Sequence, residues 1–263
     1  MSHLAPDDRA VSEALSFALV FGLVIGSIAI VYTFGLGGLA DARDHERINN
    51  AERAFEVLGE NLDDIVLEGA PSRSTQIRMA DATLSVEEAA YLQISGKDPD
   101  TGDEYYLPTY QLRSVSFSTD DSSVKYVGGA VIRADAGGDG VMTRDPPFVF
   151  DSSGSGPNRS AIQIVRLSSA GSVAVSGDRV VQVRTERTLR TDAVVERRSF
   201  GSVQLNVSTS TPGPWLRYFE SEGLDCQDPQ PGAGEDGLTL VTCEYEDVER
   251  HSVVVVGIDV AFE

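Results

Sequence analysis

The sequence predicts an α+β protein in which a long N-terminal helix, transmembrane and then amphipathic, packs on an antiparallel β-sheet or sandwich head. Three observations support this fold class. The stretch from Ala14 to Ala40 contains no charged side chain. Apolar residues then recur with helical spacing from Ile48 to Val66. From Ser72 onward, short alternating segments rich in Val, Ile, Thr and Tyr are separated by turn residues.

The first element is an apolar helix at residues 11–40. It exceeds the ~20 residues that a helix needs to cross a bilayer. Its apolar side chains leave no polar stripe, which indicates surroundings of lipid or of similar helices. A cleaved secretory signal fits poorly, because the start is acidic and the apolar run is longer than the ~7–15 residues of such signals. Ala18, Gly22 and Gly26 form a small-residue face that favours close helix packing, although small residues are common in membrane helices generally.

The residues just before this helix resemble a processing signal. The run Asp7-Asp8-Arg9 is charged, Ala10 is small, and the apolar stretch begins at Val11. This order resembles the class III signal sequence of archaeal type IV pilins and related pilin-like proteins, especially haloarchaeal ones. The resemblance implies that a prepilin peptidase recognises Arg9 and Ala10, cuts between Ala10 and Val11, and leaves the helix on the mature protein. It covers the first 40 residues or so, and the domain plan more loosely.

Glu13 corresponds, by the same resemblance, to the acidic residue that many pilins carry near the mature N-terminus. Bacterial pilins place this glutamate slightly deeper, and many haloarchaeal pilins have Ser-Pro where this chain has Ser12-Glu13. The alternative, on hydropathy alone, is a permanent N-terminal anchor that is never processed.

The chain is strongly acidic: 41 Asp and Glu against 21 Lys and Arg give a formal net charge of −20. Lys97 and Lys125 are the only lysines. This composition resembles that of haloarchaeal proteins, for which salt screens self-repulsion over a Debye length of ~3 Å at ~1 M. The negative charge also argues against nucleic acid as a partner, because its phosphates would be repelled.

Arginines flank the apolar helix unevenly, with Arg9 before it and Arg43, Arg47 and Arg53 after it. By the positive-inside rule, this count alone would place the head in the cytoplasm. The pilin resemblance implies an extracellular head instead. We follow the resemblance, because the cysteines and glycosylation sequons described below also suit the outside of the cell.

Residues 41–68 are predicted to form an amphipathic helix that continues into the head. The glycines within residues 35–38 are expected to kink or end the apolar helix, since Gly is ~1 kcal/mol less favourable than Ala there. The amphipathic helix should end near Glu68, before Pro71. One face is apolar and is expected to pack on a core: Ile48, Ala51, Phe55, Leu58, Leu62, Ile65 and Val66.

The head, residues 69–263, is predicted to be β-rich and extracellular. A short helix is expected at Pro214–Glu220, with its aromatic residues in the core. Segments 179–186 and 196–207 flank Arg190-Thr191-Asp192 and are expected to pair as a long hairpin that turns there. The full set of expected strands is 75–79, 81–86, 91–95, 111–118, 123–132, 147–150, 160–167, 173–188, 193–207 and 252–262.

The head contains the only two cysteines, Cys226 and Cys243, in a segment rich in Gly, Pro and Asp. The absence of C-x-x-C and the presence of only three histidines argue against zinc. A disulfide is expected outside the cell and would add ~3 kcal/mol of stability, with two free buried thiols as the alternative. Asn158 and Asn206 begin N-x-S sequons and are therefore predicted glycosylation sites.

No nucleophile elbow, zinc-protease motif or phosphate loop is present, so an enzyme is not expected. Four carboxylates lie in one short loop, and oxygen clusters of this kind suit Ca²⁺. The loop lacks the full EF-hand pattern, so a solvated turn is the favoured interpretation and a calcium site the alternative; no other cofactor is expected. The four residues are Asp98, Asp100, Asp103 and Glu104.

These observations lead to a structural hypothesis. Residues 1–10 would be a leader, 11–40 a transmembrane or filament-core helix, 41–68 an amphipathic helix and 69–263 an extracellular domain. The protein would assemble into, or assist, a type IV pilus-like filament, with roles in adhesion or structure. Its partners would be the membrane, other pilin subunits and prepilin peptidase. The alternative is an unprocessed, membrane-anchored extracellular binding domain.

Overall fold

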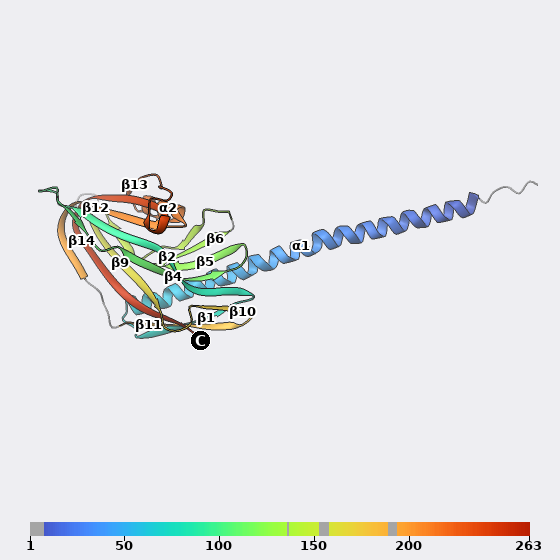
Figure 1. Ribbon diagram of the computed structural model, residues 1–263, viewed down its shortest axis with the longest axis horizontal. Coiled ribbons are helices and arrows are strands. Elements are labelled where there is room, and N and C mark those ends of the chain that lie inside the picture. Colours follow the sequence, from blue (N-terminus) through green and yellow to red (C-terminus); the bar gives the residue numbers. More distant parts are fainter. Residues whose placement is uncertain (1–7, 136, 153–157, 189–193) are drawn as a thin grey trace, which may run out of the picture. The chain divides into compact units, whose positions relative to one another are not determined.

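The structure, a computed structural model, describes residues 8–135, 137–152, 158–188 and 194–263 (Figure 1). Within these ranges, the side chains of residues 8–14, 34–42, 44 and 194–200 are not described. The chain divides into two compact units, Met1–Arg47 and Ile48–Glu263.

Helix α1 runs from Asp8 to Val66 and therefore includes both predicted helical segments. The glycines within residues 35–38 do not end it, since their backbone is helical. The cost of ~1 kcal/mol per glycine is small beside the hydrogen bonds of a long helix. The predicted end near Glu68 is confirmed to within two residues.

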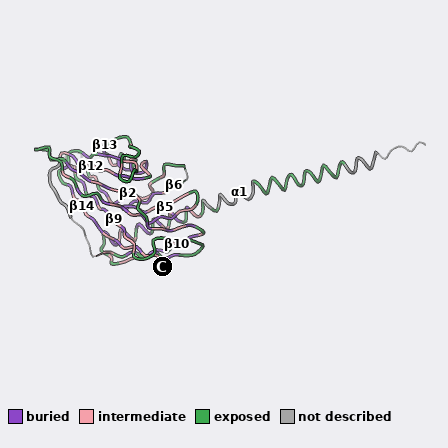
Figure 2. The backbone as a smooth tube through the Cα atoms, viewed as in Figure 1, coloured by how far each residue is buried: buried purple, intermediate pink, exposed green. Residues whose placement is uncertain are grey.

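In the first unit, every residue from Leu15 to Thr33 is exposed (Figure 2). This stretch of 19 residues is long and apolar enough to cross a membrane. It is the single such helix within the described part of the chain.

In the second unit, the remainder of α1 packs on the sheet with the predicted face. All seven apolar residues predicted for this face are buried in one core: Ile48, Ala51, Phe55, Leu58, Leu62, Ile65 and Val66. The opposite side of the helix, which includes Arg53, Glu56 and Glu60, is exposed. A helix with one apolar stripe buries that stripe and leaves its charged face in water.

The head is built on one large sheet with the order β1-β11-β14-β12-β2-β4-β5-β6-β7, to which β3, β8, β9, β10 and β13 add as side branches (Figure 1). Among the described strands, every pairing is antiparallel except that of β14 with β9, which is parallel. The α+β class with a mainly antiparallel sheet is confirmed. The strands are β1 (Ser72–Arg78), β2 (Ala82–Lys97), β3 (Glu104–Tyr106), β4 (Tyr110–Ser118), β5 (Ser122–Val127), β6 (Ala130–Asp135), β7 (Val141–Arg144), β8 (Phe148–Asp151), β9 (Asn158–Ser169), β10 (Ala174–Gly177), β11 (Val180–Arg187), β12 (Val194–Thr209), β13 (Asp225–Cys226) and β14 (Thr239–Phe262).

Two hydrophobic cores form around this sheet. The α1 core contains the buried face of α1, and the α2 core contains Trp215 and Phe219 of helix α2 (Pro212–Ser221). On β9, Ile164 belongs to the α2 core and the next residue, Val165, to the α1 core. Because successive strand residues point to opposite faces, the two cores lie on opposite sides of β9. The presence of α2, with its aromatic residues in a core, confirms the predicted short helix.

Three strand predictions are wrong. Segments 81–86 and 91–95 are one strand, β2, with a register shift between Glu88 and Ala90. Segment 123–132 is instead the β5–β6 hairpin, which turns at Gly128 and Gly129, where both φ angles are positive. Segment 173–188 is divided into β10, which pairs with β2, and β11, which pairs with β1 and β14.

The predicted hairpin of 179–186 with 196–207 is also wrong. Strand β14 lies between β11 and β12 in the sheet and pairs with both. The turn proposed for it, Arg190-Thr191-Asp192, lies outside the described residues. Strand β14 begins at Thr239, not at Ser252, and its extra length supplies the central partner that the prediction lacked.

Candidate functional site

The exposed apolar stretch of α1 is the first candidate site. Large side chains point outward all around it, among them Phe17, Leu23 and Val31, each at least 67% exposed. Exposing this much contiguous apolar area to water is unfavourable by roughly 25 cal/mol per Å². A membrane or other apolar helices are therefore the surroundings in which this segment is stable.

The predicted processing residues lie at the start of α1. The backbone of Arg9, Ala10, Val11 and Glu13 is helical, and their side chains lie outside the described part of the structure. Residues 1–7 of the leader also lie outside it. Cleavage after Ala10 therefore stays a prediction from the sequence.

Three arginines of the sheet hold the second half of α1 in the head. Arg144 of β7 pairs with Asp63, Arg133 of β6 with Glu52 at 3.1 Å, and Arg73 of β1 with Asp64 at 2.9 Å. Gly59 makes room for the first of these, because a Cβ atom there would lie 2.8 Å from Cδ of Arg144. None of these pairs was predicted from the sequence: two of them join residues 81 positions apart, and the third, Arg73 with Asp64, crosses from the first strand back to the helix.

Cys226 and Cys243 form a disulfide, with their Cα atoms 4.1 Å apart. They face each other directly in the β13–β14 pairing. The bond closes the loop that carries the 3₁₀ turn at Glu235–Gly237 and ties it to the central strand of the sheet. The expected disulfide is therefore present, in place of the alternative of two free thiols.

Replacing both cysteines by serine should lower the free energy of unfolding by about 3 kcal/mol, because the unfolded chain is no longer restricted by a closed loop. Urea denaturation of the full-length protein measures this change. Treatment of the wild type with reductant should lower its midpoint similarly. An unchanged midpoint in both experiments would contradict the structural role of the bond.

The two predicted glycosylation sites differ in their surroundings. Asn158 lies at the start of β9, where its Nδ2 donates to the backbone oxygen of Glu246 at 2.8 Å. Asn206 lies within β12, which pairs with strands on both sides, and is half-buried. Its Nδ2 donates to Oε1 of Gln93 at 3.5 Å. Glycosylation at either asparagine remains a prediction.

The acidic loop between β2 and β3 forms a turn. Oδ1 of Asp98 accepts hydrogen bonds from the backbone nitrogens of Asp100 and Thr101 at 2.9 and 3.0 Å. These bonds lower the pKa of the Asp98 carboxyl, Thr101 contributing most. Throughout the described ranges, no three His, Cys, Asp or Glu side chains are grouped as a metal site would require. The calcium alternative, which also included Asp103 and Glu104, therefore finds no support.

His251 of β14 is a buried polar residue that the sequence analysis did not single out. It is 3% exposed, and its Nδ1 lies 2.7 Å from Oγ of Ser160 on β9. Burial lowers the pKa of this imidazole to about 4, because the charged form would lose its hydration. The local sequence does not mark this residue as inward-facing, because four consecutive valines follow Ser252 and the register of β14 against β9 shifts just before it.

Stability should therefore depend on pH through His251. Between pH ~6.5 and ~4 the unfolded chain takes up a proton at this histidine and the folded chain does not. The free energy of unfolding should fall as the pH drops through this window, by about 3 kcal/mol. Urea denaturation of the wild type and of His251→Gln, compared at both ends of the window, isolates this contribution. Equal pH dependence in the two proteins would contradict the assignment.

Comparison with known proteins places the chain in a family without assigning a function. Residues 9–261 match the model of a family described as being of unknown function, DUF7289. No curated protein and no solved structure gives a significant match. The match begins at Arg9 and includes the apolar helix as well as nearly the whole head. Because it spans almost the full sequence, the chain belongs to the family of unknown function DUF7289.

Proposed function

We propose that this protein is a pilin-like, membrane-anchored surface protein. A prepilin peptidase removes its leader, and the helix that remains enters a pilus-like filament or its assembly machinery. One observation carries the proposal. Helix α1 is apolar and exposed over Leu15–Thr33. Later in the same helix, from Ile48 to Val66, the apolar face is buried in a β-rich head. A helix of this kind serves as an anchor before assembly and as a subunit contact after it.

Two further features support this proposal. The sequence around Arg9, Ala10 and Val11 resembles a class III signal, which would leave the helix on the mature protein. The disulfide suits an oxidising environment and hence a head outside the cell. In this proposal the role is structural or adhesive and not enzymatic, and the helix partners are lipid and other pilin subunits.

A second candidate is an unprocessed anchor that displays a binding domain. It shares the exposed apolar helix and the β-rich head, and it differs in retaining residues 1–10. Processing at Ala10 therefore separates the two candidates.

Ala10→Trp should block processing, because the peptidase implied by the resemblance cuts after a small residue. Ala5→Trp, in the leader but away from the cut, is the matched control. In native membranes, the Ala10→Trp protein should keep the full-length mass and be absent from sheared surface filaments, and the control should be cut normally. If the Ala10→Trp protein is cut or assembled like the control, the proposal fails.

A further inference from the structure

Strands β2, β12 and β14 present a polar face on the side opposite to their residues in the α2 core. Because side chains alternate along a strand, the residues between those of the core point to this other side. The α2-core residues of the three strands occupy alternate positions: Leu92 and Ile94 on β2, Leu205 and Val207 on β12, and Val241 and Cys243 on β14.

The strand register arranges the polar residues of this face in rows. Each row takes one residue from β2, one from β12 and one from β14. The two central rows contain amides, hydroxyls and one carboxylate, and no apolar side chain. They are Ser95–Gln204–Glu244 and Gln93–Asn206–Thr242; Ser95 and Thr242 are buried, so the amides and Glu244 form the accessible part of the face.

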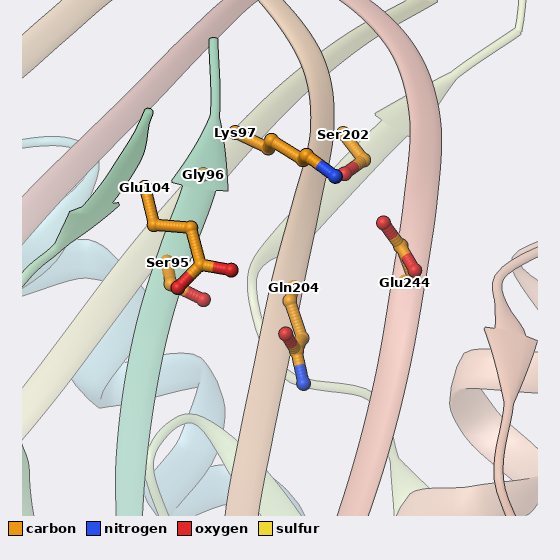
Figure 3. A pocket seen from close by; sticks show the side chains of 7 residues that line it. All are labelled: Ser95, Gly96, Lys97, Glu104, Ser202, Gln204 and Glu244. Carbon is orange, nitrogen blue, oxygen red and sulfur yellow. The ribbon is translucent and has the colours of Figure 1, made fainter. Parts of the chain in front are cut away.

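The face is hollowed into two adjoining recesses of about 200 and about 130 Å³. Figure 3 shows the larger one, with Glu104 and Glu244 on opposite sides and the side chains of Lys97 and Gln204 between them. Both are smaller than the ~300–1,000 Å³ typical of enclosed small-molecule sites. Two small, open recesses that follow each other along a sheet are better suited to successive units of an extended ligand than to a single enclosed cofactor.

The amides of this face are already held by one another. Nε2 of Gln204 donates to Oδ1 of Asn206 at 3.2 Å, and Nδ2 of Asn206 donates to Oε1 of Gln93 at 3.5 Å. Each amide has two N–H donors and two acceptor lone pairs, so these two hydrogen bonds leave further donors and acceptors free to bind a ligand. Side chains that are fixed before binding lose less conformational entropy on binding. Sugar hydroxyls, which both donate and accept, match such groups.

Two tyrosines border the amides. Tyr106 of β3 lies opposite Ser95, and Tyr91 lies two residues before Gln93 on the same strand face. The hydroxyl of Tyr91 donates to the Asp236 carboxylate, which links the ring to the disulfide-closed loop. Tyrosine combines an apolar ring with a polar end, so its ring can pack on the C–H-lined face of a sugar while its hydroxyl remains hydrogen-bonded.

We propose that this face, termed the amide cleft and comprising the two recesses, the two central rows, Tyr91 and Tyr106, binds an uncharged oligosaccharide. Anionic glycans are disfavoured by the net charge of −20 and by the larger recess, where the carboxylates of Glu104 and Glu244 outnumber the single ammonium of Lys97. The site goes beyond the proposed filament role and does not depend on it, because the cleft lies wholly within the head whether or not the leader is removed.

The test uses the full-length protein in detergent micelles, titrated calorimetrically with cellohexaose, maltohexaose and N-acetylglucosamine hexamer. At least one should bind, and Gln93→Ala and Gln204→Ala should each weaken that binding at least tenfold. Gln182→Ala, an exposed amide on β11, is the matched control and should bind as the wild type does. Affinity should change little between about 0.1 and about 1 M salt, over which the Debye length falls from ~10 to ~3 Å.

A second readout needs no variant. Lys97 lines the cleft, and Lys125 lies on β5 with its Nζ 3.1 Å from Glu87. A saturating concentration of the bound sugar should slow acylation of Lys97 severalfold and leave that of Lys125 unchanged, as measured by mass spectrometry. The proposal is overturned if none of the three sugars binds, if binding falls steeply with salt, or if Lys97 is not protected.

Discussion

Phe55→Ala should lower the free energy of unfolding by about 3–5 kcal/mol, the range found when a large aromatic side chain is removed from a core. Phe55 is 0% exposed and lies in the middle of the α1 face that packs on the sheet. The loss of its ring leaves a cavity between helix and sheet, which the surrounding strands cannot close completely.

Val57→Ala is the matched control on the same helix. Val57 is 48% exposed, so its truncation should change the free energy of unfolding by less than about 0.5 kcal/mol. Urea denaturation of both full-length variants, followed by tryptophan fluorescence, measures the difference. If Phe55→Ala is as mild as Val57→Ala, the helix does not dock on the head as described.

Gly129→Ala should destabilise the head by about 3 kcal/mol or more, because two costs add at this position. Gly129 has φ of 101°, in the left-handed region that disfavours other residues. A Cβ atom there would also lie 2.1 Å from Cδ of Pro147. The proline ring cannot rotate away as a flexible side chain could, so the β5–β6 turn or the segment before β8 must move.

Gly171→Ala separates these two costs. Gly171 has φ of 119° and nothing within 4 Å of its would-be Cβ, so only the backbone cost remains. Its midpoint of thermal unfolding should fall by clearly less than that of Gly129→Ala. Equal shifts in the two variants would contradict the close packing of Pro147 on this turn.

Local pattern predicts much of this fold, and long-range pairing accounts for what it misses. The buried face of α1 from Ile48 to Val66 follows from helical spacing, because a helix repeats over a few residues. The partners of β11 and β12 cannot be predicted from local spacing, because β14 lies between these two strands in the sheet although it comes later in the chain. A strand's neighbours depend on the whole topology, which no short window contains.

Two of the missed features had usable local signals. Gly128-Gly129 between two β segments indicates a tight hairpin turn, and both residues have positive φ. Val241, Cys243 and Tyr245 alternate with outward-facing polar residues and could have extended β14 toward Thr239. The charged residues around Glu246 obscured this alternation.

The candidate sites divide in the same way. The apolar helix and the resemblance at Ala10 come from contiguous residues and can be recognised in the sequence. The amide cleft joins residues near 93, 204 and 242, and it exists only once the register of three strands is known. The arginine pairs that hold α1 likewise depend on tertiary placement, as Arg144 with Asp63 illustrates.

Identification of the mature N-terminus tests most directly whether a short leader is removed and the apolar helix retained. Protein from native membranes would be digested, and its first peptide identified by mass spectrometry. We expect a start at Val11, and a full-length start in cells that lack prepilin peptidase. A start at Met1 or Ser2 in peptidase-containing cells, or a start beyond Ala40, would contradict the pilin-like role: the first would indicate a permanent anchor and the second a secreted protein.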